Sequence, residues 1–287
     1  MRHYAWLKSR TATVIALIVT AISGALGVSD TAGQVGASDA TGVEAAREIL
    51  RRAFDNLYDF DMTTTLTLSL HNKRGEQSVR RAEIARKRID GRLHAFARFL
   101  DPPWMRGTAV LVIDNQDRSD DHFLFLPDQG RVRRVTNVQR TDAFLGSDLW
   151  YEDLERRHAE DYEVASLRWD DFKGEAVFVV SAYPTTHSGY GRVEFIIARS
   201  DHLLVKTSFY KGRAERPFKT IETPSRTVVV EKDGHLIPVR LLVNNLQRGT
   251  WTEARFERLE VNPEINDHLF TSAALESGRA IPGRGER

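Results

Sequence analysis

Apolar residues between Val43 and Leu57 recur at steps of three and four, and this spacing predicts an amphipathic helix. Arg47, Glu48 and Arg51 lie mostly off the apolar stripe. Such a helix needs an apolar surface to pack against. Its apolar positions are Val43, Ala46, Ile49, Leu50, Ala53, Phe54 and Leu57.

After this helix, apolar and polar residues alternate, which is the pattern of strands. In "MTTTLTLSLH" Leu66, Leu68 and Leu70 share one face, and "NKRG" supplies a turn to a charged partner strand. Turn sequences rich in Gly, Asp and Asn separate the later strands at hairpin spacing. We therefore expect strands near residues 62–71, 76–89, 92–100, 108–114, 122–127, 131–136, 161–169, 175–183, 190–198, 203–211, 217–223, 226–232, 237–245 and 250–261.

The order of these elements indicates a mainly β protein. No helix alternates with the strands, so a parallel nucleotide-binding sheet is not predicted. Many strands have one polar face, which fits a single curved antiparallel sheet that is wet on one side and dry on the other. The helix at 43–57 is the first candidate to cover the dry face.

The N-terminus has the pattern of an export signal. Arg2, Lys8 and Arg10 precede a nearly continuous apolar run over 12–28, and small residues lie near the end of this run. We expect a cleaved signal peptide at 1–27, and the alternative is an uncleaved inner-membrane anchor. The remaining divisions expected are a flexible leader at 28–42, a single domain at 43–275 and a disordered tail at 276–287.

Charge and cysteine content narrow the function classes. Without Arg2, Lys8 and Arg10, the 41 basic residues fall to 38 against 40 acidic ones, a formal balance of minus two. This balance is not that of a nucleic-acid-binding protein. The chain has no cysteine, so it has no lipobox, disulfide or thiolate metal site. No cofactor and no metal are predicted.

The segment "DAFLGSDLWYEDL", residues 142–154, is the candidate site for chemistry. Asp148, Glu152 and Asp153 could supply the paired carboxylates of a hydrolase. They also fit a helix start, with Asp148 as the N-cap, Gly146 freeing the backbone before it, and Glu152 and Asp153 complementing the helix dipole. We favour architecture over catalysis, because no established catalytic motif accompanies these acids.

Three consecutive blocks in this region resemble a known family. They read "DPPWMRGTAVLVID", "FLFLPDQGRVRRVTNVQR" and "DAFLGSDLWYEDL" within residues 101–154. They are similar to the LolA-like family of outer membrane lipoprotein-sorting proteins, which often occurs with exporters of the resistance-nodulation-division (RND) class. Leu145 stands where the family usually has methionine, and Phe125 where tyrosine is common.

The resemblance implies a LolA/LolB-like incomplete antiparallel barrel of about 11–12 strands, with helices covering its concave face. It also implies that Gly146, Ser147 and Asp148 turn the chain from the sheet into a covering segment. The motif residues expected to be structural are Gly146, Ser147, Asp148, Tyr151, Glu152 and Asp153.

Together these features predict a monomeric, periplasmic, non-enzymatic carrier that holds the acyl chains of lipids or lipoproteins in an apolar cavity. The alternative is an accessory subunit that docks on an RND-type exporter through Arg131, Arg133 and Arg134, and a carboxylate hydrolase is the third hypothesis. The cavity lining is predicted to include Leu50, Phe54, Phe99, Trp104, Met105, Phe125, Phe144, Leu145 and Trp150.

Overall fold

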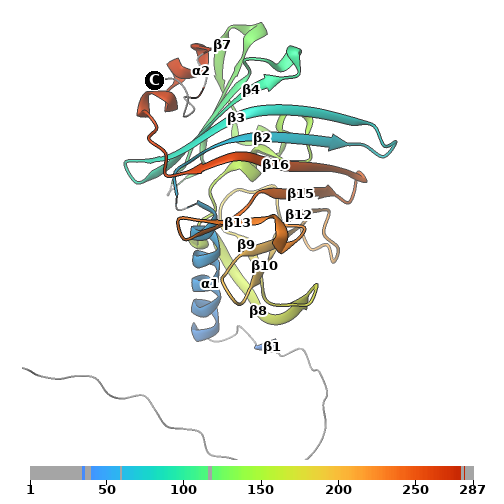
Figure 1. Cartoon of the computed structure of the whole chain (residues 1–287). Helices are drawn as coiled ribbons and strands as arrows, with labels where there is room; N and C mark the ends of the chain where they lie inside the picture. The colour runs from blue at the N-terminus through green and yellow to red at the C-terminus, as the bar shows by residue number, and fades with distance from the viewer. Residues whose placement is uncertain (1–33, 36–39, 59, 116–117, 279–280, 282–287) are drawn as a thin grey trace, which may run out of the picture. The chain divides into compact units, whose positions relative to one another are not determined.

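A computed structural model describes residues 34–35, 40–58, 60–115, 118–278 and 281 (Figure 1). The chain divides into two units, Met1–Thr31 and Ala32–Arg287, and all described residues belong to the second. The expected signal peptide at 1–27 therefore lies outside the described residues. Within the expected leader at 28–42, the described residues form β1 (Gln34–Val35) and the first turn of a helix.

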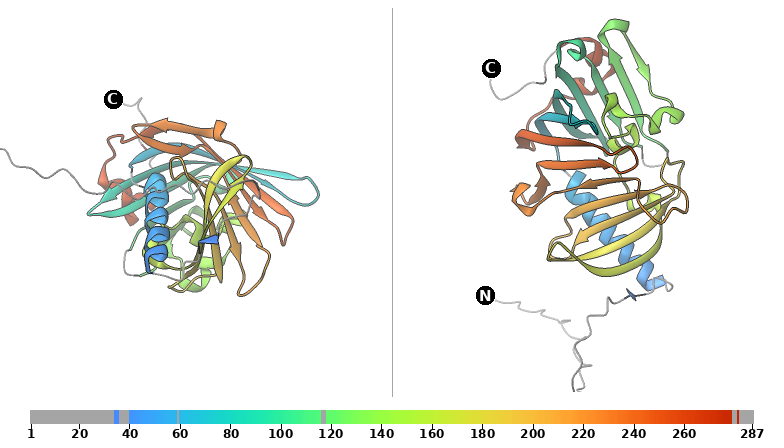
Figure 2. Two further views of the ribbon diagram at one scale, coloured as in Figure 1. Left: turned by 90° about the horizontal axis from the view of Figure 1, so that it is seen from below. Right: turned by 90° about the vertical axis from the view of Figure 1, so that its right-hand side faces the viewer.

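The main element is a 14-stranded sheet in the order β1-β8-β9-β10-β11-β12-β15-β16-β2-β3-β4-β5-β6-β7. All neighbouring strands are antiparallel, and the sheet curves strongly without closing (Figure 2). This confirms the predicted open antiparallel barrel, with more strands than the 11–12 expected. The strands are β2 (Met62–His71), β3 (Gln77–Ile89), β4 (Arg92–Asp101), β5 (Ala109–Ile113), β6 (Asp121–Leu126), β7 (Arg131–Arg134), β8 (Tyr162–Phe172), β9 (Glu175–Pro184), β10 (Arg192–Ala198), β11 (Leu204–Tyr210), β12 (Lys219–Glu222), β15 (Arg240–Asn245) and β16 (Thr250–Val261).

The remaining two strands, β13 (Val229–Lys232) and β14 (His235–Pro238), form a separate hairpin. The sequence predicted one strand across 237–245, but it is divided at Pro238, where the chain passes from the hairpin into the main sheet. Pro238 has no N–H for a ladder, so a strand can end there at little cost. The N–H of Val239 then bonds to the carbonyl of Val228 at 2.8 Å.

The predicted helix is α1 (Ala40–Tyr58), and it lies on the concave side of the sheet (Figure 2). Its apolar stripe packs against residues such as Val180 and Phe195 on β9 and β10. Leu50 and Phe54 are fully covered in this contact. The wide stripe of the sequence is thus explained by burial against the sheet.

The opposite face of β3, β4 and β5 is also covered, contrary to the expected wet side. Ala85, Phe96 and Leu111 pack there against Phe270 and Leu275 of the C-terminal segment. That segment contains α2 (Ser272–Glu276), and Ile281, within the expected tail at 276–287, is buried with it. The physical reason is visible in "TAVLV", because a strand buried on both faces is continuously apolar rather than alternating.

The chain between β4 and β8 carries most of the short 3-10 turns. They hold the loops in place by local hydrogen bonds, but none has the length of a covering α-helix. Their bounds are η1 (Pro103–Met105), η2 (Pro127–Gln129), η3 (Asn137–Thr141), η4 (Phe144–Gly146), η5 (Tyr151–Leu154) and η6 (Ala159–Asp161), followed later by η7 (Arg226–Val228) and η8 (Asp267–Phe270). Across the described part of the chain, neither helix combines the length and apolarity that crossing a membrane requires.

Candidate functional site

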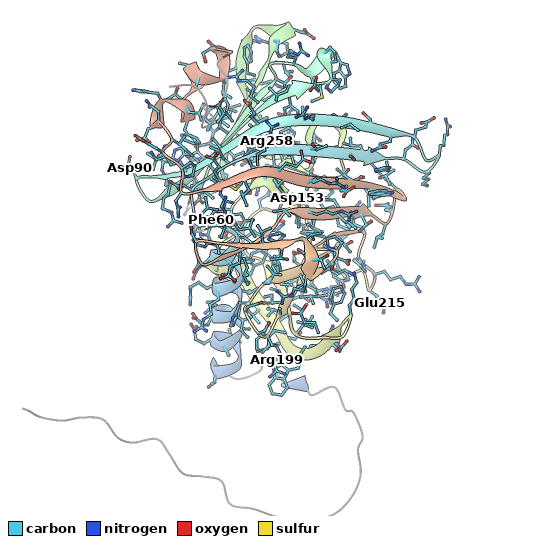
Figure 3. The ribbon with its side chains drawn as sticks, viewed as in Figure 1. Phe60, Asp90, Asp153, Arg199, Glu215 and Arg258 are labelled. Atoms are coloured by element: carbon cyan, nitrogen blue, oxygen red, sulfur yellow. The ribbon has the colours of Figure 1, made fainter. Side chains whose placement is uncertain are left out.

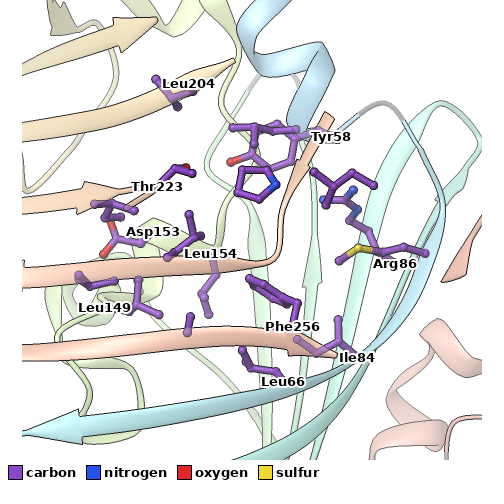
Figure 4. A pocket seen from close by; sticks show the side chains of 18 of the residues that line it. Tyr58, Leu66, Ile84, Arg86, Leu149, Asp153, Leu154, Leu204, Thr223 and Phe256 are labelled. Atoms are coloured by element: carbon purple, nitrogen blue, oxygen red, sulfur yellow. The ribbon is translucent and has the colours of Figure 1, made fainter. Parts of the chain in front are cut away.

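An apolar cavity of about 280 Å³ lies on the concave side of the sheet (Figure 4). One wall comes from the sheet, a second from the end of α1 and Phe60, and a third from the 144–157 segment. Leucine, isoleucine and phenylalanine side chains dominate all three walls. The lining residues include Leu57, Tyr58, Phe60, Leu66, Leu68, Ile84, Phe144, Leu149, Leu154, Ile221, Leu241, Ala254 and Phe256.

Strand register explains why the sheet wall is apolar. On β2 and β16, alternate residues face inward, and the antiparallel pairing sets Leu66 opposite Phe256 and Leu68 opposite Ala254. The next pairing sets Leu241 of β15 beside Ala254. Because directly opposed side chains on one face lie close together, these residues form one continuous apolar surface.

Several lining residues are only half-buried although they are large and apolar. Leu57, Leu149, Leu154 and Leu241 all retain solvent contact, whereas Leu50 in the neighbouring core is fully covered. A close-packed core leaves few such surfaces. The cavity is therefore open to solvent, and its polar groups are few.

Charged side chains reach the cavity wall from two sides. Figure 4 shows Arg86 and Asp153 on opposite sides of the view, and Figure 3 shows Asp153 among the side chains enclosed by the sheet. Arg157 also lines the wall. Asp153 forms ion pairs with neighbouring cations, whereas Arg86 has no ion pair among the described residues.

At the Asp153 side, the charges form a buried network. Lys219, whose side chain is 0% exposed, donates to Asp153 at 2.5 Å and also donates to the hydroxyl of Tyr190. The Tyr190 hydroxyl donates to the other Asp153 oxygen at 2.6 Å, and Arg157 lies 3.7 Å from that oxygen. Lys219 is also enclosed by the ring faces of Trp150, Tyr190 and Phe209.

Burial controls the protonation of this network. It lowers the pKa of Lys219, while the carboxylate of Asp153 opposes the shift. Burial also raises the pKa of Tyr190 well above 10, and the charge of Asp153 adds to the effect. Tyr190 therefore stays a neutral phenol that donates a hydrogen bond. The ion pair of Lys219 and Asp153 lies at the centre of the buried network.

The expected helix cap at Asp148 is wrong. Asp148 instead accepts hydrogen bonds from the hydroxyls of Thr250, at 2.5 Å, and Thr252, at 2.8 Å. No α-helix begins there, and the carboxylate of Asp153 accepts the Trp150 N–H at 2.8 Å in front of η5. The threonines come from a hairpin about 100 residues away, so the sequence around Asp148 contains no signal for this contact.

The other motif residues also anchor the segment rather than form a reactive group. Glu152 accepts hydrogen bonds from Ser188 and from the N–H of Gly189, and burial raises its pKa. Gly146 has a φ of +78°, which favours glycine, and Ser147 donates to the carbonyl of Phe144 at 2.7 Å. Tyr151 is buried against Phe144. The segment is thus held so that Phe144, Leu149 and Leu154 face the cavity.

Of the nine residues predicted to line the cavity, only Phe144 is in its wall. Leu50 and Phe54 belong to the core under α1, and Phe99 and Met105 to the core beside the cavity, with Leu145 packed against it. Phe125 packs on the other face of the sheet, Trp150 stacks on Tyr190, and Trp104 is 69% exposed beside Arg80. All nine residues are apolar or aromatic, but whether such a residue lies in a core, in the cavity wall or at the surface is decided by the tertiary structure.

Sequence reasoning missed most of the actual wall. The alternation of Leu66 and Leu68 was a usable signal for the sheet wall, as were the similar patterns at 237–245 and 250–261. Arg86 and Lys219 had no such signal, since each lies in a strand with other charged residues nearby. A buried lysine or arginine cannot be distinguished from an exposed one by its neighbours in sequence.

A second charged cluster lies outside the cavity. Glu155 accepts hydrogen bonds from Arg140, at 2.7 Å, and pairs with His122 at 3.0 Å. His158 pairs with Asp114 at 2.8 Å. Across the described part of the chain, no group of three or more His, Cys, Asp or Glu side chains is placed to hold a metal ion.

Asp120 in this cluster provides a pH-dependent test. Burial, with repulsion from Glu155, raises its pKa to about 8, against 3.8 ordinarily. The folded protein therefore holds the Asp120 proton more tightly than the unfolded chain does. The stability that this proton contributes to the folded state is lost as the pH rises from about 4 to about 8. We expect Asp120→Asn to stabilise the protein by more than about 1 kcal/mol at pH 8, with the gain shrinking toward pH 4. Urea unfolding across this pH range measures it, and a pH-independent difference would contradict the assignment.

Known structures share this fold. A DUF1329 family protein from Desulfovibrio piger aligns with a TM-score of 0.75 and 20% identity, over 82% of this chain and 99% of that one. A proposed outer membrane lipoprotein-sorting protein domain from Vibrio parahaemolyticus aligns with a TM-score of 0.74 and 26% identity, over 82% and 98%. A LolA superfamily protein from Nitrosomonas europaea gives 0.63 and 19%, over 79% and 97%.

No curated protein matches this sequence. A family model described as an uncharacterized protein matches residues 91–277, which is more than half of the chain. The motif blocks at 101–154 lie inside that range, and the open antiparallel barrel is that of the LolA superfamily structure. The chain therefore belongs to the family of this model, and the shared fold bears out its resemblance to the LolA-like proteins.

Proposed function

We propose that the protein is a periplasmic, non-catalytic carrier that holds an acyl chain of a lipid or lipoprotein in the cavity. The observation that carries this proposal is the set of half-buried leucines around an open apolar space. Exposed apolar surface is costly in water, and an acyl chain would remove that cost by about 25 cal/mol for each Å² it covers. Pockets of this composition are the usual sites for apolar ligands.

The carboxylates of the 142–154 segment hold the chain in place and are not arranged as a catalytic pair. Asp148 is committed to two threonines, Glu152 to Ser188 and Gly189, and Asp153 to Lys219. A hydrolase needs its two acids to face one reaction space. These acids are occupied by separate structural partners, so the hydrolase hypothesis gains no support from the geometry.

A related structure supports an acyl-chain cargo, and the N-terminal sequence supports a periplasmic location. The related domain from Vibrio parahaemolyticus is described as lipoprotein-sorting, and this description motivates an acyl-chain cargo here. The predicted signal peptide at 1–27 would direct the protein to the periplasm. The carrier would then move an apolar group through water between two membranes.

Lipid extraction tests the carrier function. We expect protein purified from the periplasm without detergent to retain lipid, identified by mass spectrometry of an organic extract. After delipidation it should bind a fluorescent fatty-acid probe with a stoichiometry near one. Heat-unfolded protein is the control. A folded protein that retains no lipid and ignores the probe would count against a carrier.

A second candidate function is docking on an RND-type exporter. Arg131, Arg133 and Arg134 are exposed on β7, the terminal strand of the sheet. An open edge with positive charge suits an acidic protein partner. We expect an Arg131→Glu, Arg133→Glu, Arg134→Glu variant to lose capture of an exporter from membrane extract. Charge reversal at the exposed Arg213, Arg216 and Arg248 is the matched control, and equal capture by both variants would remove the electrostatic basis.

A further inference from the structure

Arg86 is a buried cation at one side of the apolar cavity. It lies on β3, opposite Met62 of β2, and both residues line the cavity wall. Only 8% of Arg86 is exposed, and its guanidinium lies 4.4 Å from the ring centre of Phe60. Figure 4 shows it on the same side of the cavity as Tyr58 and Ile84.

The hydrogen-bonding capacity of Arg86 is largely unused. One terminal nitrogen donates to the carbonyl of Phe60 at 3.3 Å, and the buried Nε has no hydrogen-bond partner. Among the described residues, no carboxylate forms an ion pair with it. The nearby Asp61 instead accepts the backbone N–H of Arg88 at 2.8 Å.

The charge of Arg86 persists in this environment. Burial lowers its pKa to about 10, so the guanidinium is still protonated at neutral pH. A buried charge without a partner is costly, and an arginine offers a planar fork of donors that fits a carboxylate or a phosphate. The rings of Phe60 and Tyr58 compensate only part of this cost.

The other side of the cavity offers no equivalent site. There, Lys219 and Arg157 each form an ion pair with Asp153, whereas Arg86 forms none among the described residues. An amphiphile would therefore have a preferred direction, with its anionic end at Arg86 and its tail along Leu149, Leu154 and Phe256. The cavity of about 280 Å³ is at the lower limit of ordinary ligand pockets, which begin at about 300 Å³, and this size suits one chain.

We propose that Arg86 binds the carboxylate or phosphate headgroup of a single-chain anionic amphiphile whose tail occupies the cavity. This inference rests on the proposed carrier function and adds the charge, chain number and direction of the ligand. Fatty acids and alkyl phosphates share the required chemistry. Neutral alcohols of equal length share only the tail.

The test compares ligands with one tail and different headgroups. Delipidated protein is titrated at pH 7.4 with dodecanoate, dodecyl phosphate and dodecanol, by displacement of a neutral fluorescent probe. We expect the two anions to bind about tenfold or more tightly than the alcohol, since a hydrogen bond to a charged group is worth about 1.5–3 kcal/mol. Inorganic phosphate alone should displace nothing, because it has no tail.

Variants assign the preference to Arg86. Arg86→Met should bind all three amphiphiles with affinities within about twofold of one another, and Arg86→Lys should keep a reduced preference for the anions. Arg80→Met is the matched control, because Arg80 is also buried without an ion pair on β3 but does not line the cavity. Near-ultraviolet circular dichroism checks that each variant is folded.

Each outcome separates the two proposals. Equal binding of dodecanoate and dodecanol by the wild-type protein would overturn the anion site and leave the carrier function intact, and this comparison needs no variant. An anion preference that survives in folded Arg86→Met would overturn the assignment to Arg86. Folded wild-type protein that binds none of the three amphiphiles would overturn both.

Discussion

Asp153→Asn is expected to lower the free energy of unfolding by about 3–5 kcal/mol, the cost of breaking a buried ion pair from one side. The amide keeps the size of the side chain but removes the charge that compensates Lys219 and Arg157. Both cations would then stay largely buried without a counter-charge, with side chains that are 0% (Lys219) and 11% (Arg157) exposed. Chemical denaturation at pH 7, followed by fluorescence, measures the loss.

Asp148→Asn is the matched control, in the same segment and almost equally buried. Its partners Thr250 and Thr252 are neutral hydroxyls, so we expect a loss of only about 1 kcal/mol. Adding Lys219→Met to the Asp153→Asn variant should recover part of the stability, since it removes one uncompensated cation. Equal losses at Asp148 and Asp153 would show that charge compensation is not the main role of Asp153.

Ala254→Phe is expected to weaken binding of an alkyl probe by more than about tenfold, or 1.4 kcal/mol, because the new ring would occupy the cavity. Ala254 lies in the middle of the sheet wall, between Leu68 and Leu241 on the neighbouring strands. The cavity can accept the added volume, so we expect the free energy of unfolding to change by less than about 1 kcal/mol. Probe titration and urea unfolding of the same delipidated sample measure both quantities.

Ala182→Phe provides the reverse case. Ala182 is 0% exposed in the close-packed core under α1, where no space can take a ring. Overpacking of such a core commonly costs about 1–3 kcal/mol or more, while a cavity elsewhere keeps its affinity if the protein folds. If Ala254→Phe destabilises the protein as much as Ala182→Phe and binding is unchanged, the space beside Ala254 is core rather than a binding cavity.

The elements were predictable because their signals are local. The three-to-four spacing over 43–57 and the alternation in "MTTTLTLSLH" each reflect which side of one element is buried. The pattern did not show that β4 and β5 are covered on both faces. That depends on the C-terminal segment, which follows them by more than 150 residues.

The candidate site was predictable only in kind. An apolar cavity on the concave face was expected from the dry sheet face and the family resemblance, and of the nine residues expected to line it, Phe144 lies in the wall. Trp104 was misplaced, because an aromatic residue in a loop is equally consistent with a pocket, a core or an exposed surface. The opposite error affected Arg86 and Lys219, since charged residues are rarely buried and nothing nearby in sequence marks the exceptions.

The sequence by itself determined the helix, the strands and their antiparallel arrangement, since each is specified by the periodicity of a short segment and by turn residues. The open barrel was expected from the family resemblance. Only the tertiary structure decided which apolar residues enclose empty space and which charges meet. Leu68 and Ala254, or Asp153 and Lys219, become neighbours through strand register and sheet curvature. Those are properties of the assembled sheet, because both of these contacts join segments that are distant along the chain.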